Sequence, residues 1–471
     1  MTVDLASGAT ATEHLHRALV VAQQRFPGEL GSVDLGGADR FRRSYPDALP
    51  RFEAARVASD RRREIAEALV AAASSAVVWS DDAGECPLGQ HLAVPAAPFD
   101  TTTEELPGDG RLRPSVPIDG DVMSGGDLIA AVRTLVGRGS ATTQVADAIA
   151  WLVERAGSEG LDLGGERIVV LGAGAELAPT RLWLAGGADV LWIDVTDPSS
   201  DLLGDRRLSG RLTWIPGGAD LLEAPERVLA TIERFADGNP VDLGLYAYAG
   251  GRAREWRLTA AMNGVVDGLD RALVRSVAML VSPTTCGVLS PEEVAGEHRR
   301  RSQRPRWQAA LERVRALGDG PGHVEAGGPA VNRAVVSIQG ASYQAAQYLG
   351  KLMAAEVWAT GPDPVRVSAG TAGISRTESL QHPVFDLAFD GAAAFDVETF
   401  APDLTAHLNG LLVLHDRLDV DHRLDVGTLF ATRVHGGISE LPHPIEPALR
   451  VAAAIGLLRK PSRVVSLIRR R

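Results

Sequence analysis

The range 167–197, RIVVLGAGAELAPTRLWLAGGADVLWIDVTD, constrains the fold of this chain most strongly. Residues 168–171 form a short apolar run that ends in glycine, which is typical of a buried parallel strand. The spacing then predicts a helix from Glu176 to about Leu184, stopped by Gly186-Gly187, and a second strand from Ala188 to Ile193. The range therefore predicts one strand–helix–strand unit.

The turn of this unit has the pattern of a nucleotide-binding turn. Glycines allow a backbone to approach a pyrophosphate, and an acid about twenty residues later holds a ribose hydroxyl. Gly172 and Gly174 occupy the turn, and Asp194 ends the second strand, so we expect all three to bind a nucleotide. Glu176 favours the alternative of a purely structural turn, because a carboxylate in a first helical turn competes with a phosphate.

Composition excludes several classes of protein. The chain has 471 residues, a length that allows two domains or one large domain with a cap. A net charge of −12 argues against a nucleic-acid partner. Two cysteines, Cys86 and Cys286, are too few for a disulfide framework. We expect a cytoplasmic protein without integral membrane contact, because no apolar run of membrane-spanning length and no signal-peptide core appear.

The remaining chain suggests three parts. Residues 1–125 read as an α-rich extension, with an irregular segment at 81–120. Residues 126–430 alternate strands and helices, which predicts an α/β domain with a doubly wound parallel sheet. Residues 431–471 form a C-terminal extension with a basic tail, interpreted as a solvated helix end or a weak membrane-surface contact. The further strands of the α/β domain are expected at 211–215, 241–248, 274–281 and 365–368.

The order of signals from about residue 166 to 420 resembles the short-chain dehydrogenase/reductase superfamily. That family has a glycine-rich first turn, acids after strands two and three, an Asn-Ala-Gly-like turn, an Asn in the next helix, a Ser ending strand five, a Tyr–Lys pair and a turn after strand six. The matching residues here are Gly172, Gly174, Asp194, Asp220, Tyr248-Ala249-Gly250, Asn263, Ser282, Tyr343, Lys351 and the stretch 365–377, VRVSAGTAGISRT. The resemblance implies a Rossmann-like NAD(P)-binding domain.

The resemblance also implies catalytic roles. A phenol with a pKa near 10 needs a nearby ammonium to act close to neutral pH. Tyr343 would donate the proton, Lys351 would modulate it, Ser282 would hold the substrate oxygen and Asn263 would serve as a relay. Tyr343 and Lys351 are eight residues apart, about 80° around a helix, which departs from the usual spacing of the family but is similar to that of its enoyl reductases. Tyr348, three residues from Lys351 and about 60° away, is the alternative donor.

Each of these side chains also has a structural interpretation. The two tyrosines lie on an alanine-rich helix and suit packing, and Asn263 suits a backbone hydrogen bond within its helix. Ser282 precedes Pro283 and suits a helix cap. His382, His435 and His443 lack the spacing of a closed metal site, so we expect no metal.

The remaining expectations concern cofactor and partners. By resemblance, Asp220, Ala249 and Gly250 would contact the cofactor, and Ile374 and Thr377 would lie near the nicotinamide amide. Asp194 favours NAD over NADP, a preference that Arg206-Arg207 would reverse. The substrate would be a small molecule with a carbonyl or enoyl group, of acyl or polyketide-like type, and the family implies a homo-oligomer.

Two other classes remain open. An S-adenosylmethionine-dependent methyltransferase has a similar glycine turn and acids, but typically ends in an antiparallel hairpin strand. A non-catalytic Rossmann-fold scaffold is favoured by Glu176 and by the unusual Tyr–Lys spacing.

Overall fold

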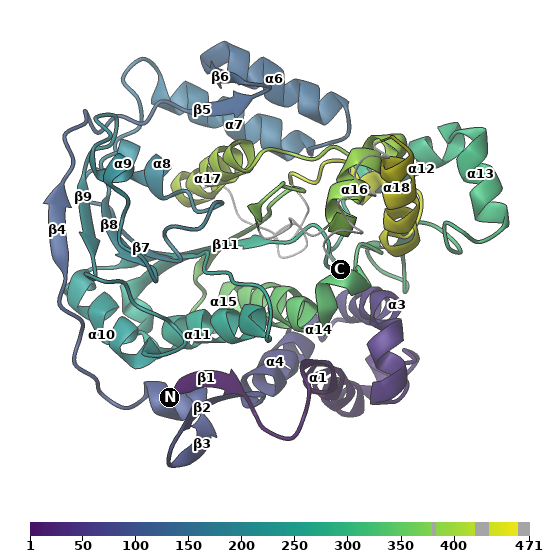
Figure 1. Cartoon of the computed structure of the whole chain (residues 1–471), viewed down its shortest axis with the longest axis horizontal. Coiled ribbons are helices and arrows are strands. Elements are labelled where there is room, and N and C mark those ends of the chain that lie inside the picture. The colour runs from purple at the N-terminus through teal and green to yellow at the C-terminus, as the bar shows by residue number, and fades with distance from the viewer. Residues whose placement is uncertain (379–382, 420–432, 460–471) are drawn as a thin grey trace.

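A seven-stranded sheet forms the centre of the computed structural model, which describes residues 1–378, 383–419 and 433–459 (Figure 1). The strand order is β14-β11-β10-β7-β8-β9-β4. All neighbouring strands are parallel except the pair of β4 and β9. The chain is therefore a mixed α/β protein with a mostly parallel sheet, as predicted. The strands are β4 (Thr102–Glu105), β7 (Arg167–Leu171), β8 (Asp189–Ile193), β9 (Arg211–Trp214), β10 (Val241–Leu245), β11 (Val274–Val281) and β14 (Arg366–Thr371).

Strand β7 shows why the sheet is buried on both sides. Successive side chains of a strand point to opposite faces. Val169 and Leu171 belong to one hydrophobic core, whereas Ile168 and Val170 belong to a second core. Because both faces are covered, the strand carries a continuous apolar run instead of an alternating pattern.

Helices cover both faces of the sheet, as Figure 1 shows for α10, α11 and α15 on one side and α7 and α17 on the other. The first face carries α10 (Pro225–Ala236), α11 (Arg254–Gly268), the π-helix η3 (Ala345–Met353) and α15 (Ala354–Thr360). The second face carries α6 (Gly125–Gly137), α7 (Thr143–Ala156), α8 (Thr180–Ala185) and α17 (Pro402–Leu418).

The N-terminal helices add a layer over the first face. Helix α4 (Arg62–Ser75) packs on η3 and α15, and α1 (Ala11–Arg25) packs on α14 (Gly340–Gln344). Side chains of both N-terminal helices share one hydrophobic core with the sheet. The extension also contains α3 (Ala38–Val57) and a small sheet of β1 (Thr2–Leu5), β2 (Val77–Asp81) and β3 (Gly84–Pro87).

Two local expectations were wrong. The helix predicted from Glu176 begins at Thr180 instead, because Ala178 precedes Pro179 and a residue before proline disfavours helical backbone angles. The segment 81–120 was interpreted as irregular, yet its residues Thr102–Glu105 form the edge strand β4, antiparallel to β9. All four residues of β4 are exposed, so the strand has no apolar alternation that a sequence pattern can reveal.

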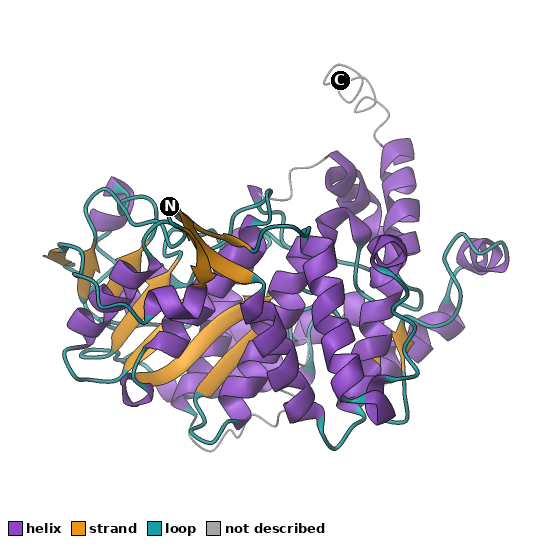
Figure 2. Cartoon of the chain, turned by 90° about the horizontal axis from the view of Figure 1, so that it is seen from below, coloured by secondary structure: helices purple, strands orange, loops and turns teal. Residues whose placement is uncertain are grey.

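The sheet occupies one half of the molecule, and the other half is almost wholly helical (Figure 2). In this half α16 (Pro383–Ala392) and α18 (Ile445–Arg459) lie side by side above a third, smaller core. A Cβ atom at Gly391 or Gly456 would lie 1.9 Å from a carbonyl oxygen of the facing helix, so only glycine permits this approach. The remaining elements are α2 (Pro27–Leu30), α5 (Leu88–Leu92), β5 (Ser115–Ile118), β6 (Asp121–Ser124), α9 (Ser200–Leu203), α12 (Pro291–Gln303), α13 (Arg306–Arg313), β12 (His323–Val324) and β13 (Val331–Asn332).

Candidate functional site

A cavity of about 590 Å³ lies at the carboxyl ends of the central strands. Its walls include the turn after β7 (174–177), the end of β11 with the residues that follow it (280–284), and the turn after β14 (372–375). Ligands of open α/β sheets bind outside the carboxyl ends of the strands, near the point where the strand order reverses. Here that point lies between β7 and β10, because the strands that follow β7 build outward from it on opposite sides.

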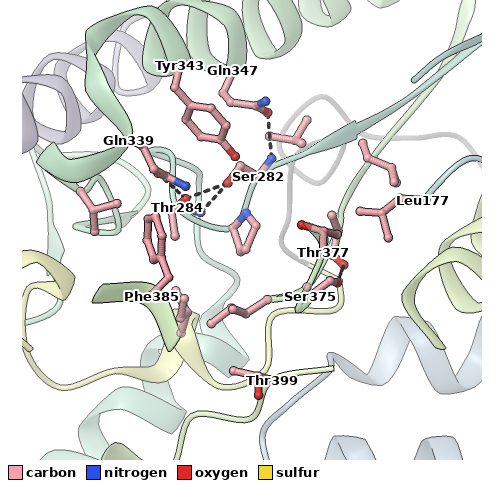
Figure 3. A pocket seen from close by; sticks show the side chains of 18 of the residues that line it. Leu177, Ser282, Thr284, Gln339, Tyr343, Gln347, Ser375, Thr377, Phe385 and Thr399 are labelled. Carbon is pink, nitrogen blue, oxygen red and sulfur yellow. Dashed lines mark hydrogen bonds between the residues drawn. The ribbon is translucent and has the colours of Figure 1, made fainter. Parts of the chain in front are cut away.

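A chain of hydroxyl groups crosses the cavity wall beneath Tyr343 (Figure 3). The Oγ atoms of Ser282 and Thr284 lie 2.8 Å apart, and the Thr284 hydroxyl donates to Gln339 Oε1 at 2.7 Å. The Tyr343 ring points toward Ser282. Burial raises the pKa of Tyr343 above its usual range, and hydrogen bonding with Ser282 and Thr284 offsets part of this rise. The phenol is therefore protonated at neutral pH, and its ring is directed at the predicted oxygen holder.

Gln347 fixes the end of β11 in this arrangement. Its Oε1 atom accepts the backbone N–H of Ser282 at 2.9 Å. Ser282 thus lies directly after β11 with its backbone tied to η3 and its hydroxyl directed to Thr284. Gln339, Thr284 and Gln347 had no assigned role in the sequence analysis, because isolated amides and threonines belong to no motif and only their proximity identifies them.

Lys351 lies on η3 and lines the same cavity as Tyr343. Its Nζ donates to the carbonyl oxygen of Leu280 at 2.6 Å. Desolvation lowers the pKa of Lys351 to about 8. The i→i+5 hydrogen bonding of a π-helix is rare and is found frequently at functional sites. The structure therefore brings Tyr343, Ser282 and Lys351 together on one cavity.

The alternative donor Tyr348 points elsewhere. It is fully buried, and its hydroxyl donates to Glu53 Oε2 at 2.6 Å. Burial, followed by the negative charge of Glu53, raises the pKa of Tyr348 far above its usual range. Arg56 binds Glu53 at 2.7 Å and Glu356 at 2.9 Å, so Tyr348 belongs to a buried ionic cluster that joins α3 to α15. The structural interpretation fits Tyr348, and the proposed catalytic role does not.

Asn263 also lies outside the main cavity. Its Nδ2 donates to the carbonyl oxygen of Gly350 at 2.6 Å, and its side chain lines a second cavity of about 350 Å³ between α4, α5 and α11. Asn263 therefore contacts η3 next to Lys351 but lines a different cavity from the one that Lys351 lines.

Close contacts and hydrogen bonds within the protein explain the conformation of the glycine turn at Gly172 and Gly174. Gly172 has a φ of +83°, and a Cβ atom there would lie 2.3 Å from the backbone nitrogen of Ala247. Its glycine requirement thus follows from the contact with the end of β10. Asp194 Oδ2 accepts the backbone N–H of Gly174 at 2.9 Å. Gly174 lines the cavity, whereas Gly172 and Asp194 lie behind it.

Of the other residues predicted to contact the cofactor, some line the cavity and others do not. Gly250, Ile374 and Thr377 line the cavity. Ala249 packs against the first core instead. Asp220 Oδ1 accepts the backbone N–H of Leu222 at 2.7 Å and lies outside the cavity lining. The structure therefore places the two turns after β10 and β14 at the cavity and leaves Asp220 in a local turn.

Two of the three histidines considered as metal ligands, His435 and His443, lie in the described part of the chain. Across the described ranges, no three His, Cys, Asp or Glu side chains are arranged to hold a metal ion. His435 and His443 are buried, and desolvation lowers their pKa values to about 3 and about 4. His382 and most of the basic tail, residues 460–471, lie outside the described residues.

Comparison with protein-family models gives no match, and a search of curated proteins gives no significant similarity. Within the part of the chain that the structure describes, no helix has both the length and the apolar character needed to cross a membrane.

Proposed function

We propose that the protein is an NAD(P)-dependent reductase of the short-chain dehydrogenase/reductase type. The observation that carries the proposal is the placement of Tyr343, Ser282 and Lys351 on one cavity at the carboxyl ends of β10, β11 and β14. Ser282 follows β11, whereas Tyr343 and Lys351 lie on the continuous α14–η3 segment, and the order of the three residues along the chain matches the resemblance. The substrate would be a small molecule with a carbonyl or enoyl group.

The strand order supports this proposal. In chain order, the six parallel strands β7, β8, β9, β10, β11 and β14 are arranged as 3-2-1-4-5-6. That is the order of the Rossmann, doubly wound fold, which binds dinucleotides across the crevice where the strand order reverses. Helices lie on both faces of the sheet here, as that fold requires.

The residues present fit the nicotinamide half of such a cofactor. Gly174, Leu177, Ile374 and Thr377 all line the cavity. When bound, the reduced cofactor would supply a hydride to the substrate carbon. Asp194 lies beside Gly174 and would accept a ribose hydroxyl, which favours NAD over NADP. Of the two arginines that would reverse this preference, Arg207 pairs with Asp205 at 2.9 Å.

The protonation states suit reduction. The substrate oxygen gains negative charge as its carbon accepts a hydride, so a neutral donor is needed. Tyr343 is protonated at neutral pH and would give its proton to that oxygen, while the Ser282 hydroxyl would donate a hydrogen bond to it. The ammonium of Lys351 would stabilise the phenolate that remains. Proton return to Tyr343 would pass through the Ser282 and Thr284 hydroxyls.

A non-catalytic scaffold is the second candidate, and the glycine turn favours it. Asp194 occupies the N–H of Gly174, and Glu176 accepts the N–H of Glu378, so carboxylates lie where a pyrophosphate would bind. The methyltransferase is less well supported. Among the described strands of the large sheet, the single antiparallel one is β4, which comes from the N-terminal part and lies at the edge opposite β14.

Self-association would need a surface other than the one the family implies. That pairing uses the helices that carry the Asn and Tyr, here α11 and the α14–η3 segment. In this chain α1 packs on α14, and α4 packs on η3.

A thermal-shift titration with NADH, NADPH and S-adenosylmethionine tests the proposal. A ligand that binds only the native state raises the melting temperature by mass action. We expect NADH to raise it most. A shift with S-adenosylmethionine alone would favour the methyltransferase, and no shift with any of the three would favour the scaffold.

A further inference from the structure

We propose that the substrate is an uncharged, mainly hydrocarbon carbonyl compound, whose hydrocarbon body lies in the part of the cavity lined by α16, η5 (Ala393–Phe395) and α18. This inference rests on the proposed function for the orientation of the carbonyl group toward Ser282 and Tyr343. The apolar compartment itself is independent of that function.

The far end of the cavity is apolar. Away from Tyr343, the lining comes from α16, η5 (Ala393–Phe395) and α18 and consists of aromatic and aliphatic side chains. Phe385 and Phe389 lie on one face of α16 with ring centroids 6.1 Å apart. Ala448 and Leu449 contribute from α18. A surface of this composition binds a ligand mainly by burying the hydrocarbon part of that ligand.

The amides of Gln339 and Gln347 and the hydroxyls of Ser282 and Thr284 lie around Tyr343, and Ser375, Thr377 and Thr399 add hydroxyls elsewhere in the lining. Thr284 and Gln339 bind each other, and the lysine of the lining, Lys351, donates to Leu280 beside Ser282. Among the described residues of the lining, those with charged side chains are Glu176, Glu255 and Lys351. At the apolar end, none of the described lining residues is a cation that can pair with a substrate carboxylate, and burial of an unpaired charge is strongly unfavourable.

One cation lies near the compartment without lining it. Arg376 is exposed, its Nε donates to Thr399 at 3.0 Å, and its guanidinium lies 5.7 Å from the ring centroid of Phe389. A carboxylated substrate would have to recruit this arginine. The pair of 2-decanone and 9-oxodecanoate separates the two cases, because they share the methyl ketone and chain length and differ only in the terminal carboxylate.

Isothermal titration calorimetry with 2-butanone, 2-hexanone and 2-decanone tests the compartment. Each buried methylene contributes about 0.8 kcal/mol, so the affinity should rise about three- to fourfold per methylene. We expect 9-oxodecanoate to bind at least tenfold more weakly than 2-decanone. Equal or tighter binding of 9-oxodecanoate, or affinities independent of chain length, would overturn the proposal.

Matched variants locate the binding. Ala448→Phe fills the compartment. It should weaken the binding of 2-decanone at least tenfold and leave the affinity for 2-butanone unchanged. Leu449→Ser, at a half-buried lining position, should reduce the rise in affinity per methylene. This variant replaces Ala448→Phe if the latter fails to fold. Leu458→Ser, at an exposed position of α18 outside the lining, is the control and should change neither the affinity for 2-decanone nor that for 2-butanone.

The proposed function can fail separately. If 2-decanone binds with the expected gain per methylene but NADH is not oxidised, the compartment stands and the reductase proposal falls. If NADH reduces short ketones and keto acids without any preference for alkyl length, the reductase proposal stands and the compartment falls.

Discussion

Glu176 Oε2 accepts a 3.0 Å hydrogen bond from the backbone N–H of Glu378, 202 residues further along the chain. This bond joins the glycine turn after β7 to the turn after β14. Both turns border the cavity, so the carboxylate lies where the proposed cofactor would pass. The interaction makes Glu176 the residue that best separates the reductase from the scaffold.

Glu176→Ala should tighten NADH binding about two- to fivefold. Glu176 precedes α8, so the relevant effect is charge repulsion, which is about 1 kcal/mol at close range in water, and loss of the carboxylate removes this repulsion of the phosphates. Isothermal titration calorimetry measures the change, and Asp201→Asn, an exposed acid on α9, is the matched control. Unchanged or weaker binding in Glu176→Ala would show that phosphates do not approach this turn.

Tyr343→Phe should lower kcat by about 10²- to 10⁴-fold, because a positioned proton donor contributes that range. NADH affinity should stay the same, since the hydroxyl faces Ser282 and Thr284. Tyr348→Phe is the matched comparison. It removes a buried hydrogen bond to Glu53, so it should lower the free energy of unfolding by about 1–3 kcal/mol and spare kcat. The reverse result would identify Tyr348 as the functional tyrosine.

Sequence patterns predicted strands well where packing alone determines them. The segment Val274–Val281 forms β11 at the predicted bounds, and Ser282 follows it as expected, because the residues from Val277 to Val281 are all apolar and buried. The edge strand β4 escaped prediction because its residues face solvent. Local patterns thus recover the centre of the sheet better than its edge.

The side chains of the site were harder to predict than the strands. Spacing at 3.6 residues per turn left Tyr343 and Tyr348 equally able to approach Lys351. The segment from Ala345 to Met353 is a π-helix, a conformation that no residue pattern announces. The Tyr348 hydroxyl donates a hydrogen bond to Glu53, which lies 295 residues earlier in the chain. Such distant contacts decide which tyrosine faces the cavity.

Arg56→Met should lower the free energy of unfolding by about 3–5 kcal/mol. Arg56 is fully buried and binds Glu53 and Glu356, so its loss removes the cation of the buried Glu53 and leaves Glu356 with Arg62. Urea denaturation measures the effect. Arg63→Met removes the exposed pair with Glu67 and should cost less than about 1 kcal/mol. Equal effects of the two variants would show that the buried ionic cluster between α3 and α15 contributes no more to stability than an exposed ion pair.

The pH dependence of kcat/KM should report Lys351. Its pKa of about 8 lies below the usual value of 10.5, so the side chain loses its charge as pH rises through about 8. The neutral amine cannot stabilise the phenolate left on Tyr343, and kcat/KM for ketone reduction should therefore fall above about pH 8. Lys351→Arg keeps its charge across this range, and whatever activity it retains should stay level to higher pH.

The same pKa gives a stability prediction with a definite sign. Between about pH 8 and 10.5 the unfolded chain binds a proton at Lys351 that the native state does not, so the free energy of unfolding contributed by this residue rises with pH. Lys351→Met removes that rise. Urea denaturation at pH 7, 8 and 9.5 measures it as the difference between wild type and Lys351→Met. A difference that does not change with pH would show that Lys351 titrates normally, and the expected pH profile of kcat/KM would lose its basis.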